Sequence, residues 1–119
     1  MQRRLLHGGR ALRTGYAEAV AVRADRRGQG HGAAVMAAAE RFITGAYDLG
    51  ALGAAEEAVG FYTARGWRPW RGPTSALTLE HGITPTPDED SWIHVYPVAH
   101  TPLDLAGPLT CDWRDGEVW

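Results

Sequence analysis

The distribution of apolar and polar residues along the first half of the chain predicts two strands, a helix and a third strand. Residues 2–6 and 11–22 have strand character, and His7-Gly8-Gly9-Arg10 between them resembles a tight hairpin turn whose glycines accept positive φ angles. Residues 32–43 are rich in alanine and carry apolar side chains at helical spacing, and Gly45 is predicted to end that helix. Residues 47–52 are predicted as the next strand.

The second half continues with one more helix and several short strands. The helix is predicted over 54–65, with Gly66 beyond its end, and strands are predicted at 67–70, 75–79 and 92–98. The prolines and acidic residues of 81–90 predict a loop, and the tail from 100 to 119 is predicted to be irregular. This order of elements indicates an α/β fold with a mixed sheet.

Composition limits the broad class. A chain of 119 residues with 45% hydrophobic and 22% charged residues is typical of a single soluble domain. The net charge of −2 gives no indication of nucleic-acid binding. Arginines are concentrated between positions 23 and 41, and acidic residues at 88–90 and 112–117. This separation predicts one site for an anionic phosphate and another for a cation.

Cysteine use and hydropathy bear on the compartment. Cys111 is the single cysteine, so no intrachain disulfide can form, which suits a reducing cytoplasm. The N-terminal apolar stretch is too short for a signal peptide, and no stretch is long and apolar enough to cross a membrane. We therefore expect a cytoplasmic protein without a membrane partner.

A basic, glycine-rich segment, RRGQGHG at positions 26–32, lies between a predicted strand and a predicted helix. Such a segment exposes backbone N–H groups at a helix N-terminus, where they can hold phosphate. One interpretation is the pyrophosphate loop of acetyl-CoA-dependent enzymes, Arg27-x-x-Gly30-x-Gly32. A dinucleotide loop also matches by pattern, but Arg23–Arg27 separate it from the strand, and Asp48 begins the next strand instead of ending it. A connector that binds nothing is the third interpretation.

Longer stretches resemble a known family. Residues 20–36 resemble the central motif of the GNAT superfamily of N-acetyltransferases. Residues 45–52, 61–70, 72–75 and 109–119 resemble the aminoglycoside 2′-N-acetyltransferases, and the ending CDWRDGEVW is the most specific of these stretches. The resemblance covers nearly the whole chain.

The resemblance implies the GNAT (acyl-CoA N-acyltransferase) fold, a mixed, mostly antiparallel sheet with flanking helices. It implies that residues 1–119 form the C-terminal portion of a single domain that lacks the N-terminal strand-helix-helix portion. The sheet would splay beside the strand that ends at Val22, and acetyl-CoA would bind in the gap without a metal. By resemblance, the residues that hold acetyl-CoA are Val20, Ala21, Val22, Arg27, Gly28, Gln29, Gly30, His31 and Gly32.

The same resemblance assigns the chemistry of an enzyme that acetylates a small-molecule amine, the 2′-amino group of aminoglycosides, by direct attack in a ternary complex. Glu18 is the candidate base that deprotonates the amine, and Tyr62 the candidate acid for the leaving thiolate. Cys111 is expected to be a packing residue. The candidate substrate-binding residues are Glu18, Ala19, Gly53, Pro87, Asp88, Glu117 and Trp119.

Each assignment has a plainer interpretation. Glu18 would then be a solvent-facing strand residue, Tyr62 a core aromatic, residues 88–90 a solvated loop and Trp119 a hydrophobic plug. The family usually has aspartate where Glu117 stands and often serine where Gly53 stands. The stretch between Pro97 and Leu109 is slightly shorter than usual.

Alternatives also remain open at the level of function. The chain could be a GNAT enzyme acting on another amine, an inactive acyl-CoA-binding fragment, or, least favoured, a nicotinamide dehydrogenase. The missing N-terminal portion predicts an exposed, aggregation-prone sheet face, low stability, and activity that is weak or absent. The family also suggests a homodimer.

Overall fold

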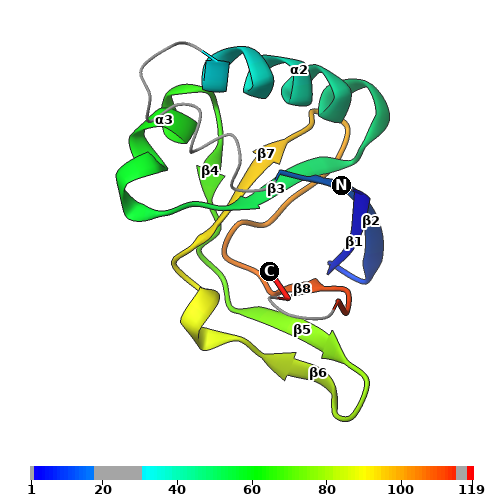
Figure 1. Ribbon diagram of the computed structural model, residues 1–119. Coiled ribbons are helices and arrows are strands. Elements are labelled where there is room, and N and C mark those ends of the chain that lie inside the picture. The colour runs from blue at the N-terminus through cyan, green and yellow to red at the C-terminus, as the bar shows by residue number, and fades with distance from the viewer. Residues whose placement is uncertain (1, 18–30, 115–117) are drawn as a thin grey trace.

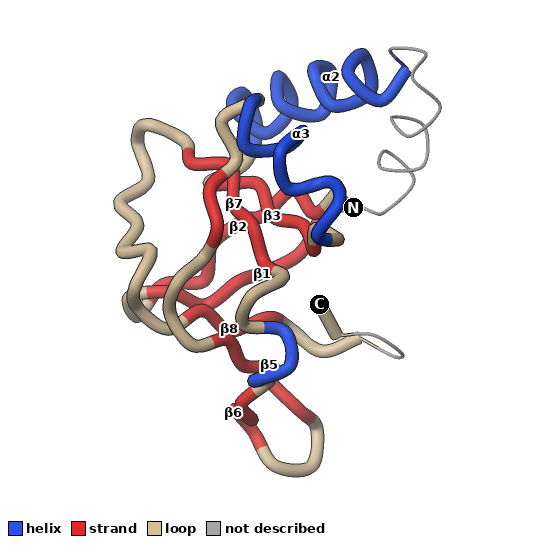
Figure 2. Tube along the Cα trace, turned by 90° about the vertical axis from the view of Figure 1, so that its left-hand side faces the viewer, coloured by secondary structure: helices blue, strands red, loops and turns tan. Residues whose placement is uncertain are grey.

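The computed structural model describes residues 2–17, 31–114 and 118–119, with 31 and 32 described by their backbone alone. It forms one curled sheet with helices packed on one side (Figures 1 and 2). The elements are, in order, β1 (Gln2–His7), β2 (Arg10–Tyr16), α2 (His31–Ala46), β3 (Leu49–Gly53), η1 (Glu56–Ala58), α3 (Val59–Ala64), β4 (Arg68–Pro69), β5 (Thr74–Thr78), β6 (Gly82–Pro85), η2 (Pro87–Glu89), β7 (Ile93–Pro97) and β8 (Leu109–Cys111).

The first two strands form the predicted hairpin. They pair antiparallel from Gln2↔Gly15 to His7↔Arg10. Gly8 and Gly9 have φ angles of 59° and 77°, which only glycine adopts without strain and which match the twist of the flanking strands. The hairpin is therefore confirmed, while the predicted continuation of the second strand from 18 to 22 lies outside the described residues.

The sheet is mixed and mostly antiparallel, as predicted. Its strand order is β4-β7-β3-β2-β1-β8-β5-β6, and the parallel pairs are β2 with β3 and β5 with β8. Curling brings its two halves together: Trp70, which follows β4, donates through its indole N–H to the carbonyl oxygen of Gly107, just before β8, at 2.9 Å. The curl thus joins residues 37 positions apart across the concave face.

Two apolar clusters hold this architecture together. The first lies inside the curl and consists of Leu5, Leu12, Tyr16, Leu49, Ala51, Trp70, Ala76, Ile93, Val95, Leu109, Cys111 and Trp119. The second lies between the sheet and the helices and consists of Met36, Ile43, Leu52, Ala54, Ala58, Tyr62, Trp67 and Val98. Alternation along β7 sends Ile93 and Val95 to the first cluster, so the strand separates two cores.

Cys111 is completely buried in the first cluster. Burial raises the pKa of its thiol to about 11, mainly because the thiolate would lose its solvation. The thiol is therefore neutral and inaccessible near neutral pH, and its prediction as a packing residue is confirmed.

Several element predictions were wrong. Gly45 does not end α2, because the helix continues to Ala46 and Gly45 does not have a positive φ. Gly66 has a φ of 97° and follows the end of α3, as predicted. The helix predicted over 54–65 is divided into η1 and α3. Residues 82–85, predicted as loop, form β6, where Pro85 is tolerated because β6 is an edge strand. The tail, predicted as irregular, contributes β8 between β1 and β5.

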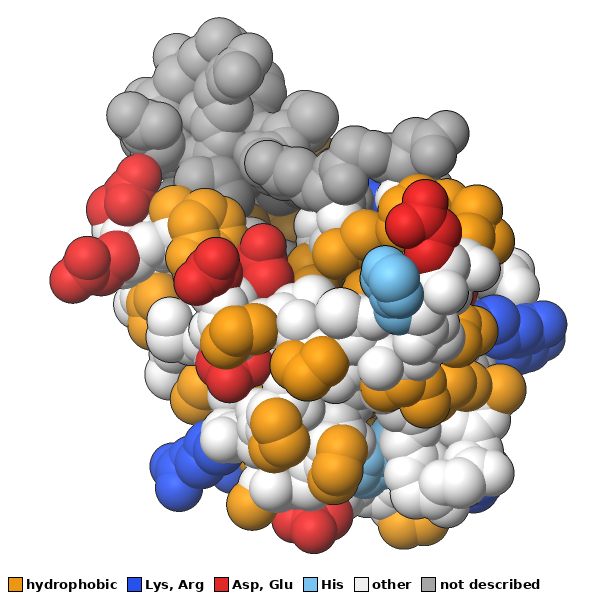
Figure 3. Space-filling view, turned by 90° about the horizontal axis from the view of Figure 1, so that it is seen from below, with side chains coloured by type: hydrophobic (Ala, Val, Ile, Leu, Met, Phe, Trp, Pro, Cys, Tyr) orange, Lys and Arg blue, Asp and Glu red, His pale blue; other side chains and the backbone are white. Residues whose placement is uncertain are grey.

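The side chains of β1 alternate between the two faces of the sheet. Arg3, Leu5 and His7 point inward and are buried, while Gln2 and Arg4 point outward and are exposed. Within the described part of the chain, the large exposed apolar side chains lie elsewhere, namely at Val35, Phe42, Leu77, Leu79, Ile83, Trp92 and Trp113. Viewed from the side of the β5–β6 hairpin, hydrophobic side chains are interspersed with polar and acidic ones (Figure 3).

Replacement of Gly72 by alanine is expected to lower the free energy of unfolding by about 1–3 kcal/mol. A Cβ at this position would meet the carbonyl oxygen of Gly107 and lie 2.7 Å from the carbonyl carbon of Ala106, and backbone cannot yield as a side-chain tip can. Urea denaturation measures the change. Gly45→Ala is the control: its Cβ would meet nothing within 4 Å in a helical backbone, so its stability should stay equal or rise. Equal losses in both variants would contradict the steric explanation.

Candidate active site

The carboxyl ends of β2 and β3 form the edge at which the predicted site residues gather. These two strands are parallel, with Thr14 opposite Leu49 and Tyr16 opposite Ala51, and the Ala17 N–H donates to the Ala51 carbonyl at 2.9 Å. The connection between them contains α2, so the N-terminus of α2 lies at the same edge. In open α/β sheets this edge is where ligands commonly bind.

Helix α2 begins at His31, within the last two residues of the glycine-rich segment 26–32 and one residue earlier than predicted. Its first turn carries no acidic residue, so no side-chain carboxylate of that turn neutralises the partial positive charge of the helix N-terminus. His31 and Gly32 form this first turn. The other predicted acetyl-CoA contacts, 20–22 and 27–30, lie outside the described residues, as does the predicted splay of the sheet.

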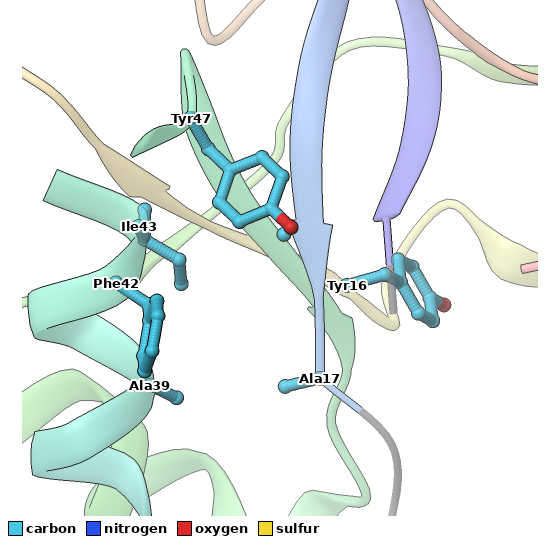
Figure 4. A pocket seen from close by; sticks show the side chains of 7 residues that line it. Tyr16, Ala17, Ala39, Phe42, Ile43 and Tyr47 are labelled. Atoms are coloured by element: carbon cyan, nitrogen blue, oxygen red, sulfur yellow. The ribbon is translucent and has the colours of Figure 1, made fainter. Parts of the chain in front are cut away.

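An apolar groove of about 230 Å³ runs between β2 and α2 (Figure 4). Ala39, Phe42 and Ile43 line it from the helix, and Tyr47 closes one end, while Tyr16 points to the opposite side of β2. Gly15 keeps this passage narrow but open, because a Cβ there would lie 2.9 Å from Cγ1 of Ile43. The sequence analysis assigned none of these residues to a binding site. Because its walls are apolar, the groove suits an uncharged chain better than a polycation.

Gly53 ends β3 beside the segment that contains Pro87 and Asp88. The Ala54 N–H donates to the Trp92 carbonyl at 2.9 Å, and the Trp92 N–H donates to the Glu89 carbonyl at 2.9 Å. Pro87 and Asp88 lie in η2 and are exposed. The structure thus brings three predicted substrate-binding residues, distant in sequence, to one end of the sheet.

Trp119 joins the same region from the C-terminal tail. Its indole N–H donates to Oγ1 of Thr86, just before η2, at 3.1 Å, and its side chain is buried in the first cluster. Its main-chain oxygen accepts a hydrogen bond from Nη2 of Arg114 at 2.9 Å. The hydrophobic-plug interpretation therefore describes the side chain, while the main-chain oxygen already has a cationic neighbour.

Tyr62 lies on α3 within the second cluster and is 1% exposed. Its ring makes edge contacts with the rings of Phe61 and Trp67, at centroid distances of 5.2 and 6.1 Å. The Tyr62 carbonyl accepts the N–H groups of Arg65 and Trp67 at 3.0 and 3.1 Å. Its ring thus has the packing expected of a core aromatic, which is compatible with a catalytic hydroxyl.

A buried carboxylate that the sequence analysis missed connects α2 to this region. Glu40, 8% exposed, accepts hydrogen bonds from Nε and Nη2 of Arg65 at 2.9 and 2.8 Å and from the Trp67 indole N–H at 2.8 Å. The hydrogen bond to Glu40 is the main cause of a raised pKa of the Arg65 guanidinium. The lone acidic residue in an alanine-rich helix was the available signal, but its partners lie 25 and 27 residues away.

The remaining predicted residues, Glu18, Ala19 and Glu117, lie outside the described residues. In the part of the chain that is described, no three His, Cys, Asp or Glu side chains gather as a metal site requires. None of the helices described there is long and apolar enough to span a bilayer.

A known protein is similar to the chain along its whole length. No family model matches the chain. An aminoglycoside 2′-N-acetyltransferase of Mycolicibacterium fortuitum is 55% identical to it over 122 aligned residues that include the whole chain. The chain is thus similar along its whole length to an aminoglycoside 2′-N-acetyltransferase. It spans 62% of the length of that relative.

This similarity confirms the resemblance drawn from the motifs. It leaves the roles of individual residues as predictions, because neither the identity nor the described geometry tests them. One edge of the sheet brings together Gly53, Pro87, Asp88 and Trp119. Helix α2 starts at the same edge with His31 and Gly32. Tyr62 lies on α3, in the core between the sheet and the helices.

Proposed function

We propose that the protein transfers the acetyl group of acetyl-CoA to the 2′-amino group of an aminoglycoside. The observation that carries this proposal is the 55% identity, over the whole chain, to a protein named for that reaction. The GNAT fold is part of the proposal. It is supported by the mixed sheet, the parallel β2–β3 pair and the helix that follows the glycine-rich loop.

In the proposed reaction, acetyl-CoA lies along residues 20–22, and the N–H groups of residues 27–32 hold its pyrophosphate. Glu18 takes a proton from the substrate ammonium, because only the neutral amine is a nucleophile. The amine nitrogen then bonds to the thioester carbonyl carbon, the C–S bond breaks, and the sulfur takes a proton from Tyr62. The nitrogen loses its second proton, which restores the Tyr62 hydroxyl through solvent, and Glu18 releases the first proton to solvent. The products are the N-acetylated amine and coenzyme A.

The substrate would be held by carboxylates, since aminoglycosides carry several ammonium groups. Asp88 supports this step because it is exposed at the edge where Gly53 ends β3. Glu18 and Glu117 complete the proposed acidic set. The hydrogen bond from the Trp119 indole to Thr86, just before η2, supports a place for Trp119 beside this acidic set.

Acetyl transfer with two paired substrates tests the proposal. Tobramycin carries a 2′-amine and kanamycin A a 2′-hydroxyl, so coenzyme A should be released with tobramycin alone. A thiol-reactive dye measures the release, and the buried neutral thiol of Cys111 should not contribute to the signal. Equal release with kanamycin A would overturn the 2′ assignment, and no release with either substrate would overturn the proposed activity of this chain.

A further inference from the structure

Trp92 is an exposed tryptophan whose backbone is fixed on both sides. It is 49% exposed and lies between η2 and β7. Its N–H donates to Glu89, and its carbonyl accepts the Ala54 N–H at 2.9 Å and Nδ1–H of His94 at 3.1 Å. His94 is 2% exposed, so this anchor is itself buried. A large aromatic ring held in place yet open to solvent is suited to contact a ligand.

The ring of Trp92 lies against the end of β3. A Cβ on Gly53 would be 3.4 Å from Cε3 of the indole and 4.0 Å from the hydroxyl of Tyr16. These are ordinary van der Waals distances, so the indole packs beside the end of the strand. This is the edge at which Gly53, Pro87 and Asp88 gather, so the ring borders the proposed substrate site.

The charges around Trp92 favour a cationic ligand. Asp88 and Glu89 belong to η2, and the Glu89 carbonyl accepts the backbone N–H of Trp92 at 2.9 Å. In the described part of the chain, the cation–π contacts involve Tyr16 and Phe61, with Arg3, Arg114 and Arg65 as the cations. Among the described residues, therefore, no arginine makes a cation–π contact with the ring of Trp92.

We propose that the indole of Trp92 is a docking platform for an amine-bearing sugar ring of the substrate, which makes it a specificity-determining residue. The inference rests on the proposed function. An amino sugar offers apolar C–H groups and an ammonium, and the electron-rich indole face attracts both. Carboxylates beside the ring then pair with further ammonium groups of the same ligand.

Binding and kinetics of Trp92→Leu and Trp92→Phe test this role, with tobramycin as the probe. Trp92→Leu is expected to raise the calorimetric Kd and the KM for tobramycin about tenfold, and Trp92→Phe about two- to threefold, because phenylalanine retains a weaker π face. The KM for acetyl-CoA should not change in either variant. Trp113→Leu is the matched control, because Trp113 is 42% exposed and lies in the tail segment after β8.

The outcomes separate this inference from the proposed function. Unchanged tobramycin affinity in Trp92→Leu, or an equal loss in Trp113→Leu, would overturn the role of Trp92 while acetyl transfer by the unsubstituted protein stands. Tobramycin binding that depends on Trp92 without acetyl transfer would overturn the proposed function alone. A protein that binds no tobramycin would overturn both. If Trp92→Leu fails to fold, the Kd and KM of Trp92→Phe for tobramycin decide the question, together with the loss in that variant of the fluorescence change that tobramycin causes in the unsubstituted protein.

Discussion

Replacement of Glu40 by alanine is expected to lower the free energy of unfolding by about 3–5 kcal/mol. The carboxylate accepts three hydrogen bonds, two from Arg65 and one from the indole of Trp67, which is 1% exposed. Its removal leaves a half-buried guanidinium without its counter-charge and a buried N–H without an acceptor. The stranded indole N–H of Trp67 is the costlier loss, because that buried group has no water to bond, whereas the partly exposed guanidinium of Arg65 keeps some solvent.

Urea denaturation followed by circular dichroism measures this change. Glu40→Gln should cost less than Glu40→Ala, because an amide oxygen can still accept from the Trp67 indole. Glu80→Ala is the control, since Glu80 forms a fully surface-exposed pair with His81, and its removal should leave the unfolding transition nearly unchanged. A Glu40→Ala protein as stable as the unsubstituted one would show that the network does not hold α2 to α3.

The network also bears on the proposed chemistry. Glu40 lies on the helix whose first turn follows the glycine-rich loop, and Arg65 and Trp67 flank the end of the helix that carries Tyr62. A bidentate carboxylate–guanidinium pair fixes orientation as well as distance. We infer that Glu40 keeps the proposed phosphate-binding end and the proposed acid in a constant relation.

The sequence predicted the parts of the fold that short-range patterns determine. The hairpin followed from two glycines that tolerate positive φ, and α2 followed from apolar positions at helical spacing. β8 was missed because its three residues are defined by partners about a hundred residues away, Leu5 and Leu6. β6 was missed because its proline and glycine suggested a loop, although an edge strand tolerates both residues.

The candidate site shows the same division. Motifs adjacent in sequence located the start of α2 and the position of Tyr62, whereas the convergence of Gly53, Asp88 and Trp119 depends on how the sheet curls. Trp92 was predicted as part of a strand, and nothing in its neighbours along the chain indicated that its ring would lie against Gly53. Contacts of this kind follow from topology, which a single sequence does not contain.

Replacement of Tyr62 by phenylalanine is expected to lower kcat by about 10²- to 10⁴-fold, the usual range for loss of a general acid, with small changes in both KM values. Phenylalanine keeps the ring, so the edge contacts with Phe61 and Trp67 should persist. Stability should then fall by no more than about 1–2 kcal/mol, the cost of one buried hydrogen-bonding group. Steady-state kinetics and urea denaturation of the same preparation measure both quantities.

Tyr96→Phe is the matched control for this experiment. Tyr96 packs on Trp67 at a centroid distance of 5.2 Å in the same aromatic group, but it has no proposed contact with the leaving thiolate. Loss of its hydroxyl should leave kcat unchanged. A kcat that falls equally in both variants would identify a packing effect, and an unchanged kcat in Tyr62→Phe would make Tyr62 a core aromatic and leave the thiolate to be protonated by another donor. If kcat falls in Tyr62→Phe alone and that variant unfolds at the same urea concentration as the unsubstituted protein, the lost rate belongs to the hydroxyl, because the ring and its packing are the same in the two proteins.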